Sequence, residues 1–219
     1  MSLYQQVRAL LYKEIVLEWR SRYALNGILL YVVSTIFVCY LSFRGVQAIT
    51  WNALFWIIML FASINAVTKS FVQESRGRQL YFYTIASAQA IILTKIIYNV
   101  FLLLLLAVLA LFFYGIVFTN PVGDPALYLL AVVLGSISFA SVFTLISSIA
   151  SKTNNSSALM AILSFPVIIP LLILLIKLSK NAMDGLDRAS SYNEIGVLLA
   201  INLIVITVSL LLFPYLWRD

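Results

Sequence analysis

The chain has 219 residues, of which 63% are hydrophobic and only 10% are charged, and its mean hydropathy is +1.05. Soluble domains carry about 25% charged residues, so this composition excludes a soluble globular protein and indicates an integral membrane protein. The formal net charge of +6 does not indicate a nucleic-acid-binding protein, because no segment is long and polar enough to form a water-facing basic domain.

The residue types also exclude several kinds of chemistry. The sequence has no histidine and a single cysteine, Cys39, so it lacks the commonest metal ligand, axial haem ligand and general base. It has no HExxH motif and no phosphate-binding loop of the form GxxxxGK[ST]. We therefore expect no metal site and no enzymatic activity, and energy from ATP would have to come from a partner protein.

Residues 3–22 are predicted to form an amphipathic helix that lies along the membrane surface. Apolar residues recur there at a helical period with charged residues between them. Ser2 and Gln5 have the spacing of a capping box, and Trp19 and Tyr23 are typical of the lipid–water interface. The alternative is that the segment is the water-exposed start of the first membrane-spanning helix.

Six apolar runs are long enough to cross a hydrocarbon core about 30 Å thick. They predict a single all-α membrane domain over residues 1–219, with six transmembrane helices after the interfacial helix. Lys95, Lys177 and Glu194 lie near the ends of these runs, and we expect their charges to reach the headgroups. With no charge well inside a run, an ion pump or proton-driven carrier is not indicated. The predicted spans are residues 24–43, 51–68, 91–118, 126–150, 157–176 and 195–217.

The distribution of Lys and Arg predicts the orientation of the chain. If the N-terminus is cytoplasmic, only four of the 14 basic residues lie on the opposite side, and the positive-inside rule then places both termini in the cytoplasm. Those four residues are Arg44, Lys177, Lys180 and Arg188.

The cytoplasmic loop over residues 69–90 joins the second and third predicted spans and includes the sequence SFVQESRGRQLYFY. A solvated basic loop that obeys the positive-inside rule would explain its arginines. It would not explain the combination of an acid, a glycine and three aromatics, so we predict that this loop contacts an ATPase. The residues predicted for the contact are Glu74, Arg76, Gly77, Arg78, Gln79 and Leu80.

Two patterns concern helix packing in the fourth and fifth predicted spans. Small residues recur every four positions in the fourth span and form a ridge, which either packs within the chain or serves as a dimer face. The ridge residues are Ser136, Ala140, Thr144 and Ser148. In the fifth span, Pro166 and Pro170 each remove a backbone donor, so the helix should bend or break there. Either the bend is a hinge that lines a path, or it has no function.

The six spans, the interfacial N-terminal helix, the basic cytoplasmic loop and the run PVIIPLLIL from Pro166 to Leu174 resemble the heme exporter protein B family, CcmB. The resemblance covers nearly the whole chain. The family's loop pattern of an acid, a glycine, a leucine and a lysine is matched by Glu74, Gly77, Leu80 and Lys95.

The resemblance implies an ABC-2-type permease-like bundle in the bacterial inner membrane, working in cytochrome c maturation. It implies a separate ATPase subunit, CcmA, which alone binds ATP, and the neighbours CcmC, CcmD and the haem chaperone CcmE. Haem would be a transient cargo of the permease, or it would stay on the chaperone that the complex releases. From the symmetry common to oligomers we expect two copies per complex. The alternatives are a membrane scaffold that transports nothing, or an ABC-2-type exporter of another lipophilic substrate.

Overall fold

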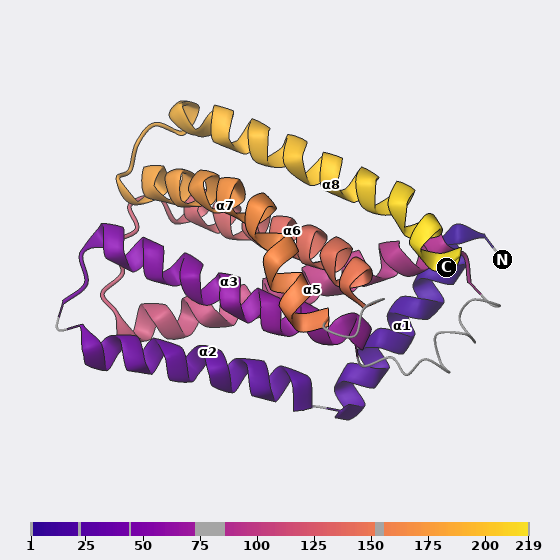
Figure 1. Cartoon of the computed structure of the whole chain (residues 1–219). Coiled ribbons are helices and arrows are strands. Elements are labelled where there is room, and N and C mark those ends of the chain that lie inside the picture. The colour runs from indigo at the N-terminus through magenta and orange to yellow at the C-terminus, as the bar shows by residue number, and fades with distance from the viewer. Residues whose placement is uncertain (1, 22, 44, 73–85, 152–155, 219) are drawn as a thin grey trace.

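The computed structural model describes residues 2–21, 23–43, 45–72, 86–151 and 156–218, and every regular element in these ranges is helical. Figure 1 shows the arrangement. In chain order the helices are α1 (Leu3–Ser21), α2 (Tyr23–Ser42), α3 (Ala48–Val72), α5 (Ala88–Val117), α6 (Pro125–Ala150), α7 (Ser156–Met183), the short 3-10 helix η1 (Arg188–Ser191) and α8 (Tyr192–Arg218).

In the described part of the chain, five helices are long and apolar enough to cross a membrane, and they lie within α3, α5, α6, α7 and η1–α8. The described apolar part of α2, Asn26–Ser42, is shorter. All six predicted apolar runs are helical, and most bounds agree to within a few residues. The largest difference is in α7, which continues to Met183 rather than ending near residue 176. The all-helical prediction is therefore confirmed, and the count of six spans stays a prediction.

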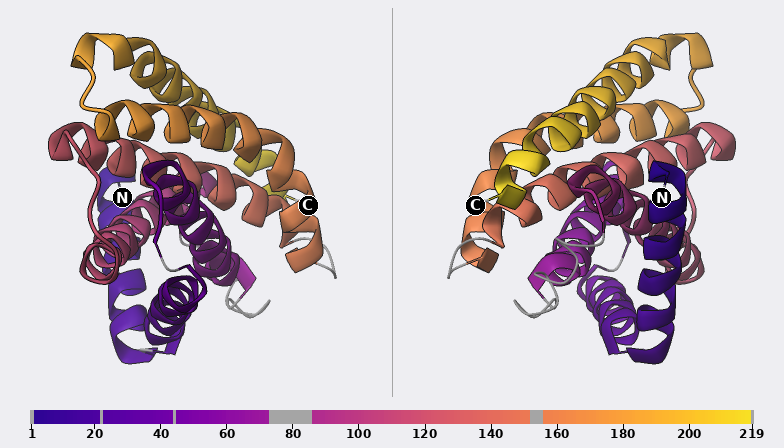
Figure 2. Two further views of the ribbon diagram at one scale, coloured as in Figure 1. Left: turned by 90° about the vertical axis from the view of Figure 1, so that its left-hand side faces the viewer. Right: turned by 90° about the vertical axis from the view of Figure 1, so that its right-hand side faces the viewer.

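In Figure 1 the helices α2, α3 and α5–α8 extend between the two ends of the bundle, whereas α1 lies across one end. In Figure 2, where α2, α3 and α5 are seen nearly end-on, α6, α7 and α8 slant across the view. We call the end that α1 crosses the α1 end; it also holds the start of α5 and the end of α8. The opposite end, which we call the Asp124 end, holds the connections over residues 118–124 and 184–191. The start of α1 and the end of α8 both lie at the α1 end.

The central helix is α6, which contacts α3, α5, α7 and α8 and is the most buried of the five apolar helices. Its small residues let four neighbours approach closely. The ridge of Ser136, Ala140, Thr144 and Ser148 is no more than 2% exposed, so helices of the same chain cover it. The hydroxyl of Ser136 donates to the Val132 carbonyl at 2.8 Å, which satisfies its polar group inside the helix.

Gly135 of α6 provides the closest approach in this core. A Cβ atom at this position would lie 2.6 Å from two ring carbons of Trp56 on α3. The Trp56 ring is itself held, because its Nε1 donates to the Ser179 hydroxyl of α7 at 2.8 Å. One glycine therefore allows α3, α6 and α7 to meet.

The two prolines of α7 do not interrupt it, because one helix continues across both Pro166 and Pro170. Each proline lacks the backbone N–H that would donate to the carbonyl four residues earlier. We therefore expect only the Ile162 and Pro166 carbonyls to lose a helical hydrogen bond. The ribbon of α7 changes direction in its N-terminal half in Figures 1 and 2. Of the two predicted outcomes, a bend or a break, the helix shows the bend, and a hinge role stays a prediction.

The Asp124 end is closed by a network around one carboxylate. Asp124 Oδ1 caps α6 by accepting from the amides of Ala126 and Leu127 at 3.0 and 3.2 Å. Arg188 of η1 donates to both carboxylate oxygens, with Nε 2.7 Å from Oδ2 and Nη2 3.1 Å from Oδ1. The Asp124 amide donates to the Ala182 carbonyl of α7 at 2.7 Å. Asp124 thus joins the start of α6 to the end of α7 and to η1.

We predict that Gly135→Ala destabilises the protein by about 1–3 kcal/mol, because the added methyl group overpacks a site that Trp56 cannot vacate without losing its hydrogen bond. The measurement is thermal or chemical unfolding in detergent. The matched control is Gly196→Ala in α8, where a Cβ meets no atom within 4 Å. Equal stability of the two variants would contradict the prediction.

We also predict a stability step at acid pH that depends on Asp124. The Arg188 side chain and the amides of Leu127 and Ala126 lower the pKa of Asp124 to about 2, below its ordinary value of about 3.9. The resulting stabilisation is fully present above pH 4 and is lost as the pH falls through about 2. Thermal midpoints between pH 5 and 2 should show this loss in the wild type and not in Asp124→Asn. The control, Asp184→Asn, should behave as wild type.

Candidate functional site: the joint between α1 and α5

The residues predicted to contact an ATPase lie outside the described residues: Glu74, Arg76, Gly77, Arg78, Gln79 and Leu80. The structure does describe the two helices that flank them. α3 ends at Val72 and α5 begins at Ala88, so both flanking helices reach the α1 end of the bundle (Figure 1).

The start of α5 is both capped and tied to α1. Ser87 is the N-cap residue, and its hydroxyl oxygen accepts from the Ala90 amide at 3.3 Å. Gln6 of α1 accepts from the Ser87 amide and from the Ser87 hydroxyl, each at 3.0 Å. The C-terminal part of the predicted coupling loop is therefore bonded to the N-terminal helix.

The centre of the joint is a shielded ion pair. Lys95 Nζ of α5 lies 3.0 Å from Glu14 Oε1 of α1, and the two side chains are 3% and 11% exposed. Glu14 also pairs with Lys13 at 2.9 Å. The expectation that Lys95 reaches the headgroups is wrong, because its charge is met inside the protein by a carboxylate of α1 instead.

A third polar contact continues the joint, since the Tyr98 hydroxyl donates to Glu18 Oε2 at 3.0 Å. The pairs Gln6–Ser87, Glu14–Lys95 and Glu18–Tyr98 are separated by 81, 81 and 80 residues. This nearly constant separation means that successive turns of α1 meet successive turns of α5, with the two chains running in the same general direction where they meet.

Apolar side chains complete the joint and extend it to the end of the chain. Ile92 and Ile96 of α5 form a buried cluster with Phe213 of α8, and Leu10 of α1 packs against this cluster. Three helices therefore meet beside the predicted coupling loop.

Glu14 and Glu18 are packing residues that the sequence did not indicate. Their charges are typical of the polar face of an amphipathic helix, whereas the structure places both against α5. A signal was present in their spacing. Val7, Leu11, Glu14 and Glu18 are separated by four, three and four residues, so the two acids continue an apolar stripe on one side of the helix.

The joint is connected to the central helix through one buried hydrogen bond. Asn99 Nδ2, one turn beyond Lys95 on α5, donates to Thr144 Oγ1 of α6 at 2.8 Å. Both side chains are fully buried. Thr144 belongs to the small-residue ridge, so this hydrogen bond joins α5 to the most buried of the apolar helices.

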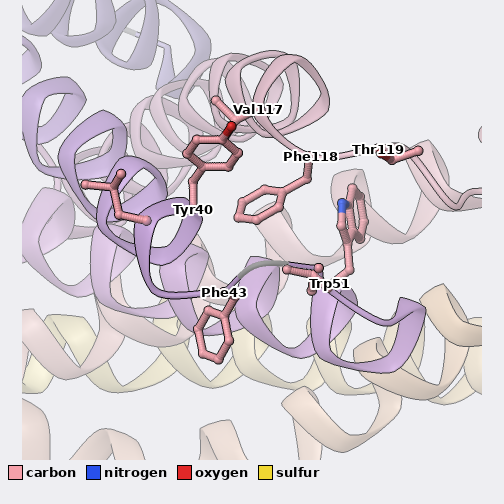
Figure 3. Close-up of a pocket in the computed structure, with 9 residues that line it drawn as sticks. Tyr40, Phe43, Trp51, Val117, Phe118 and Thr119 are labelled. Atoms are coloured by element: carbon pink, nitrogen blue, oxygen red, sulfur yellow. The ribbon is translucent and has the colours of Figure 1, made fainter.

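A pocket of about 490 Å³ lies at the Asp124 end, between α2, the start of α3 and the end of α5 (Figure 3). Four of its nine lining residues are aromatic; of these, Tyr40 and Phe118 lie edge to face with 6.0 Å between ring centroids. In the described part of the chain, no group of three His, Cys, Asp or Glu side chains is placed to hold a metal ion. The lining residues are Tyr40, Leu41, Phe43, Gly45, Val46, Trp51, Val117, Phe118 and Thr119.

The aromatic side chains continue from this pocket into the bundle without a gap. Trp51 stacks on Phe55 with 6.2 Å between centroids, and Phe55 contacts Trp56 at 5.5 Å. Trp56 in turn contacts Phe139 of α6 at 6.2 Å. All four of these side chains are at most 1% exposed, so the bundle interior is filled along this line.

Two comparisons with known proteins bear on the family to which this chain belongs. A comparison with curated proteins gives no match. The family model described as CcmB protein matches residues 5–215, a range that includes the α1–α5 joint, the predicted coupling loop and both prolines of α7. The chain therefore belongs to the CcmB family, the membrane permease component of the ABC-type haem exporter complex in cytochrome c biogenesis.

Proposed function

We propose that this chain passes the motion of a separate ATPase subunit into its membrane helices through the loop over residues 69–90 and the α1–α5 joint. The observation that carries this proposal is the shielded ion pair between Glu14 and Lys95. It fixes α1 to the helix that follows the loop, and Asn99 connects that helix to α6. A push on the loop would therefore move α1, α5 and α6 together.

The filled interior favours this mechanical role over conduction of haem through a single copy of the chain. Trp51, Phe55 and Trp56 occupy the line along which a cargo would pass, and each is 1% exposed. Passage by that route would require well-packed aromatic side chains to separate, and their burial and ring contacts oppose this separation. The work of the complex is then release of the haem-loaded chaperone, or passage of haem along another surface of the assembly.

The placement of the chain in the membrane belongs to the same proposal. The apolar helices cross the bacterial inner membrane with both termini in the cytoplasm, and α1 lies along the cytoplasmic surface. The transverse position of α1 (Figure 2) and the common location of the two termini (Figure 1) support this placement. Two copies of the chain form the membrane part of the complex, beside an ATPase of the CcmA type and the other maturation proteins.

We predict that Glu74→Ala weakens co-purification of the ATPase subunit and lowers cytochrome c assembly, because the substitution removes the acid from the loop that binds the partner. The control is Asp184→Ala, which removes an exposed acid at the Asp124 end and should leave both measurements unchanged. Undiminished co-purification and normal assembly in Glu74→Ala would refute the coupling role of the loop.

A second prediction tests the joint itself. Lys95→Met leaves Glu14 shielded without this partner and should cost about 3–5 kcal/mol in unfolding free energy. In Glu14→Leu with Lys95→Met, both charges are replaced by apolar groups, and most of that stability should return. A double-mutant cycle on chemical unfolding measures the coupling.

Simple addition of the two single effects in this cycle would contradict the ion pair as the link between α1 and α5. If the double variant regains stability and ATPase binding but not cytochrome c assembly, the charges themselves take part in coupling. If assembly also returns, attachment of α1 is what coupling requires.

A further inference from the structure

The side of α1 that faces away from α5 carries a regular row of exposed residues. Tyr4, Arg8, Tyr12, Ile15 and Trp19 follow each other at spacings of four, four, three and four residues, which places them on one face of the helix. We call this row the outward stripe. Its aromatic side chains are among the most exposed of the described large hydrophobic residues, with Tyr4 at 74%, Tyr12 at 72% and Trp19 at 75%.

The charges of α1 are divided between its two sides. Its only acids, Glu14 and Glu18, bond to Lys95 and Tyr98 of α5. Arg8, within the outward stripe, and Arg20, beside it, are exposed and have no ion pair with another described residue. The outward side of α1 is therefore basic and carries no acid.

We propose that the outward stripe is a binding surface for anionic lipid headgroups. Tyrosine and tryptophan place an apolar ring in the outer hydrocarbon and a polar tip among the headgroups. Arg8 stands one turn from both Tyr4 and Tyr12, so these rings set its guanidinium at headgroup depth, where it binds phosphate oxygens. This proposal rests on the placement of α1 at the cytoplasmic surface that is proposed above. It adds that the lipids bound there carry anionic headgroups.

The position of α1 favours a lipid over a protein as the occupant of this surface. In the views along the bundle, α1 lies at the periphery of the other helices (Figure 2). A partner that docks on the loop over residues 69–90 approaches from the α1 end, along the axis of the bundle. The exposed outward stripe belongs to a helix at the periphery of the bundle, where the lipid of the cytoplasmic leaflet would surround the protein.

The test uses the full chain reconstituted in phosphatidylcholine vesicles that contain a minor fraction of brominated lipid, either phosphatidylglycerol or phosphatidylcholine. Bromine in the acyl chain quenches tryptophan that the lipid contacts. The chain has four tryptophans, so the Trp19 signal is the difference between the wild type and Trp19→Phe. The control variant is Lys180→Gln, which removes an exposed basic residue near the Asp124 end.

We expect brominated phosphatidylglycerol to quench Trp19 more strongly than brominated phosphatidylcholine at the same mole fraction. Arg8→Gln should lower this preference about fivefold, and adding Arg20→Gln should remove most of what remains. High salt should weaken the preference in the wild type. Lys180→Gln should leave it unchanged.

Three outcomes would overturn the proposal. Equal quenching by the two lipids would refute recognition of anionic headgroups while leaving α1 at the membrane surface. Quenching by neither lipid would also refute the surface placement, and the loop-coupling proposal would still stand on its own co-purification test. Loss of Trp19 quenching when the ATPase subunit is added would show that a protein occupies the stripe.

Discussion

A lysine ammonium that is shielded from water needs a carboxylate beside it, and this requirement determines how the α1 end is built. Lys95 stands seven residues beyond the first residue of α5, and Glu14 of α1 meets it at 3.0 Å. An uncompensated charge at this depth would cost several kcal/mol. The N-terminal helix is therefore part of the folded bundle, because it supplies the counter-charge that α5 needs.

Apart from the ion pairs Asp124–Arg188 and Lys177–Glu194, the rest of the bundle is held by small residues and a few hydrogen bonds. Lipid offers no partner for a polar group, so contacts between helices depend on close packing and on polar groups satisfied inside the protein. Gly135 and the ridge of α6 supply the close packing. Asn99 and Trp56 each use a side-chain nitrogen to bond a hydroxyl on a neighbouring helix. The core therefore combines large aromatic rings with small helix surfaces that accept them.

The sequence predicts the helices well because a membrane helix is identified by a long apolar run. The predicted end of α7, near residue 176, is too early, because Lys177 and Lys180 make the last turns of this helix resemble a loop. In the structure Lys177 pairs with Glu194 of α8 at 2.6 Å, which holds these polar residues in the helix. The position of α1 was harder to predict, because Glu14 and Glu18 resemble solvent-facing residues until their partners Lys95 and Tyr98 are known. A pairing between residues about 80 positions apart has no local signature in one sequence.

Cross-links between helices gather at the two ends of the molecule, and this has a consequence for α5. Its 30 residues make a rod about 45 Å long. Near its far end, the Tyr114 hydroxyl donates to the Trp51 carbonyl of α3 at 3.0 Å. A rod that is held at one end and pushed at the other behaves as a lever, and a tilt of about 5° moves the pushed end by about 4 Å. A small displacement delivered beside Ser87 would thus become a change of angle about Tyr114, whose ring contacts Trp51 and Phe118 of the pocket at the Asp124 end.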